Sequence, residues 1–229
     1  MAVKLLTPSA EQRMKAYHEL SHRAKTLVKG APQKPTITLS REFGCEAFPV
    51  GEELVKLLER MTDEVWILVD KSLLDEVAKE KNISEDIIRS LGQKPRWLDD
   101  MFATLSPKWK SDRDYYQFLV EQVVSIATAG NAVFVGLGAA IITQHMKNCH
   151  HFRLIADQNF KVQSMARRMN LSKQDAELLV VEQQKERNRV IRKLLDADER
   201  DPRYYHLIFN NGKVKNQKIV QSIADYVVK

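Results

Sequence analysis

The stretch from Thr36 to Gly51 constrains the fold of this 229-residue chain more than any other segment. It begins with Thr-Ile-Thr-Leu, the β-branched and apolar composition of a short buried strand. A loop that contains Gly44 follows, and an apolar pattern with helical spacing begins at Val50. In a strand, glycine loop and helix, backbone N–H groups and the helix N-terminus can hold a phosphate. The sequence therefore predicts a phosphate-binding loop in an α/β domain.

The residues inside this loop depart from the usual phosphate-binding motif. That motif reads G-x-x-x-x-G-K-[ST], in which the lysine contacts the phosphates and the hydroxyl contacts magnesium. This chain has Glu46, Ala47, Phe48 and Pro49 in the loop, so neither group is present. The function of the protein depends on whether this altered loop still works.

Composition indicates an ordinary globular protein, with 44% hydrophobic and 29% charged residues. Five of the six net positive charges fall in residues 1–34, ahead of a main domain at 35–229. The apolar spacing in that segment predicts a basic amphipathic helix over residues 9–29. Such a helix can contact nucleic acid or an acidic surface. A solvated face on a packing helix is the simpler interpretation, so we do not expect a nucleic-acid partner.

Residues 123–143 carry no charge, over about the length that crosses a bilayer. Gly130-Asn131 lies within this run and predicts a turn between the end of a helix and a buried strand. The run therefore predicts buried structure, and we expect no membrane association.

The segment His18-Glu19-Leu-Ser-His22 matches the zinc motif H-E-x-x-H. It lies on the polar face of the predicted basic helix without a third ligand, so we expect no catalytic metal there. The two cysteines, Cys45 and Cys149, have the spacing of neither a metal site nor a disulfide framework. Their scarcity predicts a reducing compartment and a cytoplasmic protein.

Short apolar strands alternate with helices along the rest of the chain. This alternation predicts a three-layer α/β/α fold with a mainly parallel five-stranded sheet. Ligands bind such sheets at the carboxyl ends of the strands, where we expect Gly44, Asp70, Gly136 and Asp157 to meet. The first expected strand begins at Thr36, and the other four cover 65–69, 132–135, 152–156 and 206–209. The helix after the glycine loop is expected to end near Met61, and the later helices are expected at 71–81, 84–91, 112–129, 139–146, 158–169, 172–193 and 215–227.

Two further patterns suit phosphate chemistry, although packing alone also explains each. Gly136-Leu137-Gly138 follows the third strand and permits a close backbone approach to a ligand or a tight turn. Arg187, Arg189 and Arg192 present guanidinium groups, which bind phosphates through paired hydrogen bonds. The alternative for these arginines is a charged, solvated helix face.

Taken in order, these pieces resemble the cytidylate-kinase-like family of P-loop proteins, relatives of the nucleoside monophosphate kinases. The resemblance covers about residues 35–228. It rests on Ile37-Thr-Leu-Ser-Arg-Glu-Phe-Gly44, Val69-Asp70-Lys71-Ser-Leu-Leu, Val133-Phe-Val-Gly136, Lys185-Glu-Arg-Asn-Arg and Asp201-Pro-Arg-Tyr-Tyr-His-Leu-Ile-Phe-Asn-Asn.

The resemblance implies a kinase that transfers the γ-phosphoryl group of ATP, with Mg²⁺, to a nucleoside monophosphate such as CMP. It also implies a helical insert at about 71–130 and a lid at about 170–203. The implied catalytic residues are Arg41, Asp70, Arg187, Arg189 and Arg192. The implied nucleotide-binding residues are Ser40, Gly44, Cys45, Glu46, Ala47, Phe48, Gly51, Gly136 and Gly138.

Two cations that the family pattern places near phosphates are replaced here by Phe48 and Leu137. Loss of one such charge can slow phosphoryl transfer by about 10³-fold. The alternative function is therefore a catalytically inactive nucleotide-binding or protein-interaction module on the same fold. A homodimer is a further prediction, with the N-terminal helix and residues 92–130 as its candidate surfaces.

Overall fold

The computed structural model describes residues 14–20, 22, 33–80 and 112–228. Five strands form one sheet in the order β2-β3-β1-β4-β5, and all four strand pairings are parallel. The strands are β1 (Thr36–Arg41), β2 (Ile67–Val69), β3 (Ala132–Val135), β4 (Cys149–Ile155) and β5 (Leu207–Asn210).

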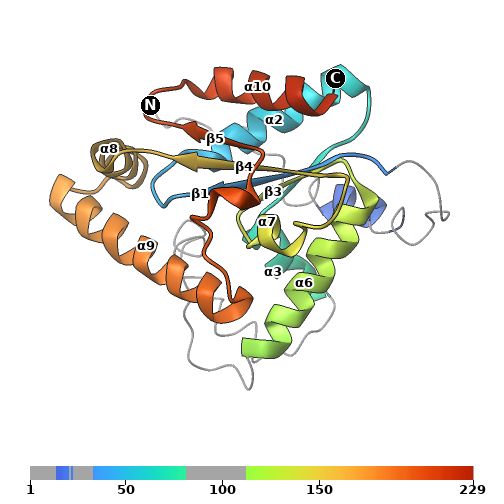
Figure 1. Cartoon of the computed structure of the whole chain (residues 1–229), viewed down its shortest axis with the longest axis horizontal. Helices are drawn as coiled ribbons and strands as arrows, with labels where there is room; N and C mark the ends of the chain where they lie inside the picture. The colour runs from blue at the N-terminus through green and yellow to red at the C-terminus, as the bar shows by residue number, and fades with distance from the viewer. Residues whose placement is uncertain (1–13, 21, 23–32, 81–111, 229) are drawn as a thin grey trace.

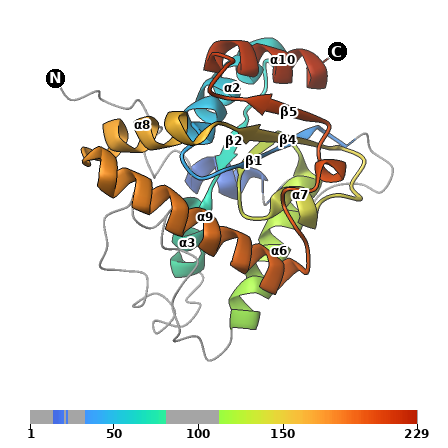
Figure 2. The same ribbon diagram turned by 60° about the vertical axis from the view of Figure 1, so that its left-hand side comes forward.

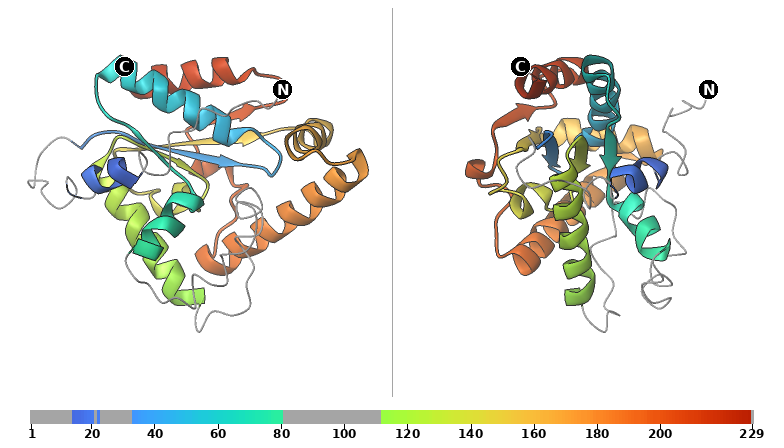
Figure 3. Two further views of the ribbon diagram at one scale, coloured as in Figure 1. Left: turned by 180° about the vertical axis from the view of Figure 1, so that it is seen from behind. Right: turned by 90° about the vertical axis from the view of Figure 1, so that its right-hand side faces the viewer.

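Helices cover both faces of this sheet (Figure 1). Two of them, α2 and α10, lie side by side over one face, and α3, α6 and α7 lie on the other (Figure 3). The three-layer α/β/α fold predicted from the sequence is confirmed. The helices are α2 (Ala47–Thr62), α3 (Lys71–Glu80), α6 (Asp112–Ala129), α7 (Ala139–Ile142), α8 (Gln158–Met169), α9 (Lys173–Leu195), the 3₁₀ turn η1 (Pro202–Tyr204) and α10 (Asn216–Val228).

The sheet separates two apolar cores. Ile37 and Leu39 of β1 pack with Leu54 of α2 and Ile223 of α10 on one side. On the other side, Phe134 of β3 packs with residues of α3 and α6. Burial on both faces explains why the strands are continuously apolar, as is usual for parallel sheets.

Several element boundaries differ from those predicted. β4 begins at Cys149 and thus includes two histidines ahead of the predicted strand. The His151 ring shares a hydrogen bond of 2.9 Å with the Thr38 hydroxyl, which satisfies this polar side chain inside the sheet. α7 ends at Ile142, where the Thr143 hydroxyl donates to the Ala139 carbonyl. The predicted helix at 84–91 lies outside the described residues.

Residues 14–20 form the described part of the predicted N-terminal helix. Tyr17 and Leu20 on this helix are buried in the core beside α3 and α6. The Tyr17 hydroxyl donates to the Gln122 side chain at 2.7 Å. This helix therefore packs on the main domain through its apolar face.

Gly130 and Asn131 both have positive φ and form the predicted turn between α6 and β3. The uncharged run at 123–143 thus folds as a helix end, a turn and a buried strand. None of the described helices is long and apolar enough to cross a membrane.

His151 is the most deeply buried histidine of a cluster near the β4–β5 edge of the sheet. Its ring lies 5.3 Å from that of His206, and His150 and Tyr226 complete the cluster. Burial, together with the charges of His206 and His150, lowers the pKa of His151 from 6.5 to about 4. Because the folded state holds this ring neutral, the unfolded state takes up the proton first as the pH falls.

Lowering the pH from 7 to 5 is therefore expected to reduce the free energy of unfolding by about 2 kcal/mol through His151. The loss begins near the unfolded pKa of 6.5 and is complete below the folded value of about 4. Urea unfolding of the wild type and of His151→Gln at both pH values measures this effect. Equal losses in the two proteins would contradict the assignment to His151.

Candidate functional site

A cavity of about 130 Å³ lies at the carboxyl ends of β1 and β3, between α6 and α9. Figure 2 shows α9 running past these strand ends toward α6. Three cationic side chains line the cavity: Arg41, Lys71 and Arg187. Its apolar walls include Phe43, Leu119, Val135, Leu137, Val190, Ile191, Leu194 and Leu195.

Arg41 ends β1 and lies directly against the backbone of Gly136, the residue that follows β3. A Cβ built on Gly136 would lie 1.6 Å from Arg41 Nη1, and this glycine has a φ of 78°. Only glycine accepts both conditions without strain. Gly136 therefore sets the position of the Arg41 guanidinium in the cavity.

Two side chains of α9 hold this helix against the loop after β1. Gln184 Oε1 accepts a hydrogen bond from the Phe43 N–H at 2.7 Å. Arg187 Nη1 donates to the Arg41 carbonyl at 3.1 Å, and its guanidinium carbon lies 5.6 Å from the centre of the Phe43 ring. These contacts bring Arg187 to the same cavity as Arg41.

Glu46 precedes α2, and both its backbone N–H and its carboxylate form hydrogen bonds to distant parts of the chain. Its N–H donates to Asn211 Oδ1 at 2.7 Å. Its carboxylate accepts from Arg167 Nη2 at 2.7 Å and from Asn216 Nδ2 at 2.9 Å. These residues line a second, more open hollow of about 530 Å³ between α2, α8 and the β5–α10 connection.

At Gly44 the backbone of the loop packs directly against α8. Gly44 has a φ of 97°, and a Cβ placed on it would lie 2.7 Å from the Cβ of Lys161. Lys161 Nζ in turn pairs with Glu42 Oε2 at 3.0 Å. Beside it, burial and the Glu42 charge raise the pKa of the Cys45 thiol to about 12, so this cysteine is protonated at neutral pH.

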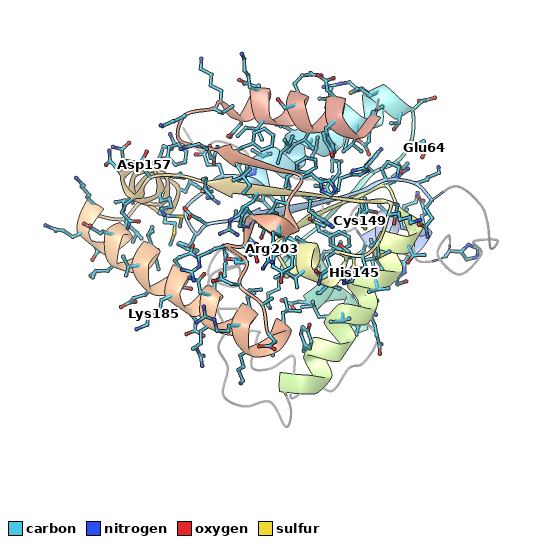
Figure 4. The ribbon with its side chains drawn as sticks, in the orientation of Figure 1. Glu64, His145, Cys149, Asp157, Lys185 and Arg203 are labelled. Atoms are coloured by element: carbon cyan, nitrogen blue, oxygen red, sulfur yellow. The ribbon has the colours of Figure 1, made fainter. Side chains whose placement is uncertain are left out.

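The structure places the predicted catalytic residues in different surroundings. Arg41 and Arg187 share the cavity, whereas Asp70 is buried and accepts from the Leu73 N–H at the start of α3. Arg189 forms an exposed pair with Glu186, and Arg192 an exposed pair with Asp198 at 3.5 Å. Figure 4 shows Lys185 on the outer side of α9. Catalytic roles for these residues stay predictions.

The predicted nucleotide-binding residues also divide into two sets. Gly136 and Gly138 line the cavity. The others lie in the loop or in the core around it: Ser40, Cys45, Ala47 and Gly51 are buried, Phe48 packs partly buried against the core, and Gly44 and Glu46 contact α8 and its neighbours.

The cavity also contains residues that sequence reasoning did not assign to a site. Lys71 lines it while pairing with Asp75 at 2.6 Å. Its place after Asp70 in the family-like segment Val69-Asp70-Lys71-Ser-Leu-Leu was the available signal. Tyr116, Gln183 and Glu199 line it as well. No motif marked these three, because they reach the cavity only through the packing of α6, α9 and the connection that follows α9.

His18 and His22 of the H-E-x-x-H match are both exposed. Across the described residues, no group of three or more His, Cys, Asp or Glu side chains has an arrangement that could hold a metal ion.

The fold of this chain is similar to that of a solved structure. No curated protein matches the chain significantly. An uncharacterized protein from Eubacterium ventriosum ATCC 27560 is 20% identical, with a TM-score of 0.61 over 86% of this chain and 99% of its own. Shikimate kinase from Bacteroides thetaiotaomicron is 11% identical, with a TM-score of 0.44 over 85% of this chain and 99% of its own.

The match to a family model is more specific than these structural likenesses. The model of the cytidylate kinase-like family matches residues 36–213, from the start of β1 to the connection after β5. This range contains the loop, the cavity and the whole of α9. The chain belongs to the cytidylate kinase-like family.

Proposed function

We propose that this protein binds a nucleoside monophosphate, or a similar phosphate monoester, in the cavity beside α9 without transferring a phosphoryl group to it. The observation that carries the proposal is the convergence of Arg41 and Arg187 on one apolar-walled cavity. Guanidinium groups suit a phosphate, and apolar walls suit a base. An anion with an apolar body is therefore the occupant that these residues favour.

The residues of the loop do not fit the ATP triphosphate that the family implies. The N–H groups of Phe43 and Glu46 already bind Gln184 and Asn211. The Glu46 carboxylate stands before the N-terminus of α2, where the helix dipole otherwise favours an added anion. The nearby cation Arg167 pairs with that carboxylate. A triphosphate would have to displace these contacts without a lysine in the loop to replace them.

CMP is expected to raise the melting temperature of the purified protein, and Mg-ATP with CMP is expected to yield no ADP above background. A ligand at 100 times its Kd stabilises a protein by about 2.7 kcal/mol, which is an easily measured shift. Thermal unfolding with CMP and a coupled ADP assay test the two statements separately. ADP formation that scales with protein and disappears in Arg41→Met would overturn the absence of transfer.

An active kinase that phosphorylates CMP from ATP with Mg²⁺ is the second candidate function. The contact between Arg187 and the Arg41 carbonyl favours it, because the contact brings two cations to the loop after β1. Phosphoryl transfer depends mainly on positioning and charge neutralisation, which such cations supply. This candidate requires that Arg187→Ala abolish ADP formation, whereas Lys185→Ala, on the outer side of α9, serves as its matched control.

A further inference from the structure

Glu199 is a buried acid at the edge of the cavity, in the connection between α9 and η1. The residue is 7% exposed and belongs to the cavity lining. Its Oε1 atom is buried and has no hydrogen-bond partner among the described residues. Its Oε2 atom lies 3.8 Å from Arg153 Nη1, which is too long for a hydrogen bond. A carboxylate oxygen beside the cavity thus lacks a donor.

The surroundings of Glu199 keep this carboxylate in place. The Tyr205 hydroxyl donates to the Glu199 carbonyl at 2.6 Å. Arg153, which is 2% exposed, donates through Nη1 to the Tyr205 hydroxyl at 3.3 Å. The backbone is therefore anchored, and the Arg153 guanidinium lies beside the carboxylate. A buried acceptor without a donor is costly, which argues for a partner that arrives from outside the chain.

We propose that Glu199 selects the ligand by accepting a hydrogen bond from it at Oε1. This inference rests on the proposed function, in which Arg41 and Arg187 bind the phosphate of a nucleoside monophosphate. The donor is either the amino group of the base or the 2′-hydroxyl group of the sugar, since both carry the required N–H or O–H. A ligand with a carbonyl oxygen or a hydrogen at that position leaves the carboxylate without its donor.

Calorimetric titration of the full-length protein with CMP, UMP and dCMP tests the inference. UMP replaces the amino group of CMP by a carbonyl, and dCMP replaces its 2′-hydroxyl by hydrogen. The wild type is expected to bind CMP at least about tenfold more tightly than one of the other two, since loss of a donor leaves a buried acceptor unpaired. Which analogue loses affinity identifies the base or the sugar as the donor.

The variant Glu199→Gln is expected to reduce that preference about fivefold or more, because a neutral amide accepts more weakly and can also donate. Glu182→Gln, an exposed change on α9, serves as the matched control and should keep the wild-type preference. Equal wild-type affinities for the three nucleotides would overturn the role of Glu199 even if Glu199→Gln fails to fold.

The outcomes separate the two proposals. Equal binding of all three nucleotides by the wild type overturns the role of Glu199 and leaves monophosphate binding intact. A wild-type preference that Glu199→Gln retains in full, in a folded variant, also overturns that role. Failure of every monophosphate to bind overturns the proposed function and the inference together.

Discussion

Replacing Arg41 with methionine is expected to weaken CMP binding about 10- to 100-fold, because a charged hydrogen bond to phosphate is worth about 1.5–3 kcal/mol. Methionine keeps the apolar stem and removes the guanidinium that lies at the cavity. Calorimetric titration with CMP measures the loss. Arg189→Met removes a neighbouring but exposed arginine that pairs with Glu186, and it should bind CMP as the wild type does.

Gly136→Ala should reproduce most of this loss of CMP affinity, although Arg41 itself is retained. The new Cβ would fall 1.6 Å from Arg41 Nη1, so the flexible guanidinium has to move out of its place. Combining Gly136→Ala with Arg41→Met should add little to the loss from Arg41→Met alone, because both changes remove one interaction. Fully additive losses would show that Gly136 does not act through Arg41.

Gly44→Ala is expected to destabilise the fold by about 2–5 kcal/mol, the combined cost of backbone strain and overpacking. The added methyl would lie 2.7 Å from the Cβ and 2.9 Å from the Cα of Lys161, at a φ of 97°. The α8 backbone cannot yield as a side-chain tip does, so the loop itself must shift. Chemical denaturation measures the change in the free energy of unfolding.

Gly212→Ala provides the matched control for this substitution. A Cβ on Gly212 would meet its nearest neighbour, the Cβ of Phe160, at 3.3 Å, and no positive φ strains this position. Its cost should stay below about 1 kcal/mol. If both alanine variants unfold at the same denaturant concentration, the packing of Gly44 on α8 does not limit stability.

The parallel sheet and its helices could be predicted because the spacing of apolar residues within each segment indicates which faces of that segment are buried. The run at Ala132–Val135 is continuously apolar and buried on both faces, so its pattern and its place agree. β4 was harder to delimit because His150 and His151 interrupt its apolar run. The Thr38 side chain, which comes from another strand, makes His151 acceptable there.

The candidate site was less predictable because its decisive contacts join distant segments. Glu46 was recognised as foreign to a phosphate loop, but its bonds to Arg167 and Asn216 depend on how α8 and α10 pack. The hydrogen bond from Phe43 to Gln184 likewise depends on where α9 lies. Local sequence reveals which groups a loop carries, and only the folded chain reveals which of those groups are already in use.

β1 is the middle strand of the sheet, so the sheet can form only after the strands on both sides of β1 have been synthesised. Thr36 pairs with Ala132 on one side and with Cys149 on the other, both far along the chain. At about 5–20 residues per second, the ribosome takes on the order of ten seconds to make the intervening segment. During that time an apolar strand waits without its partners, exposed to other nascent chains. β1 can therefore enter the sheet only after β3 and β4 have been made.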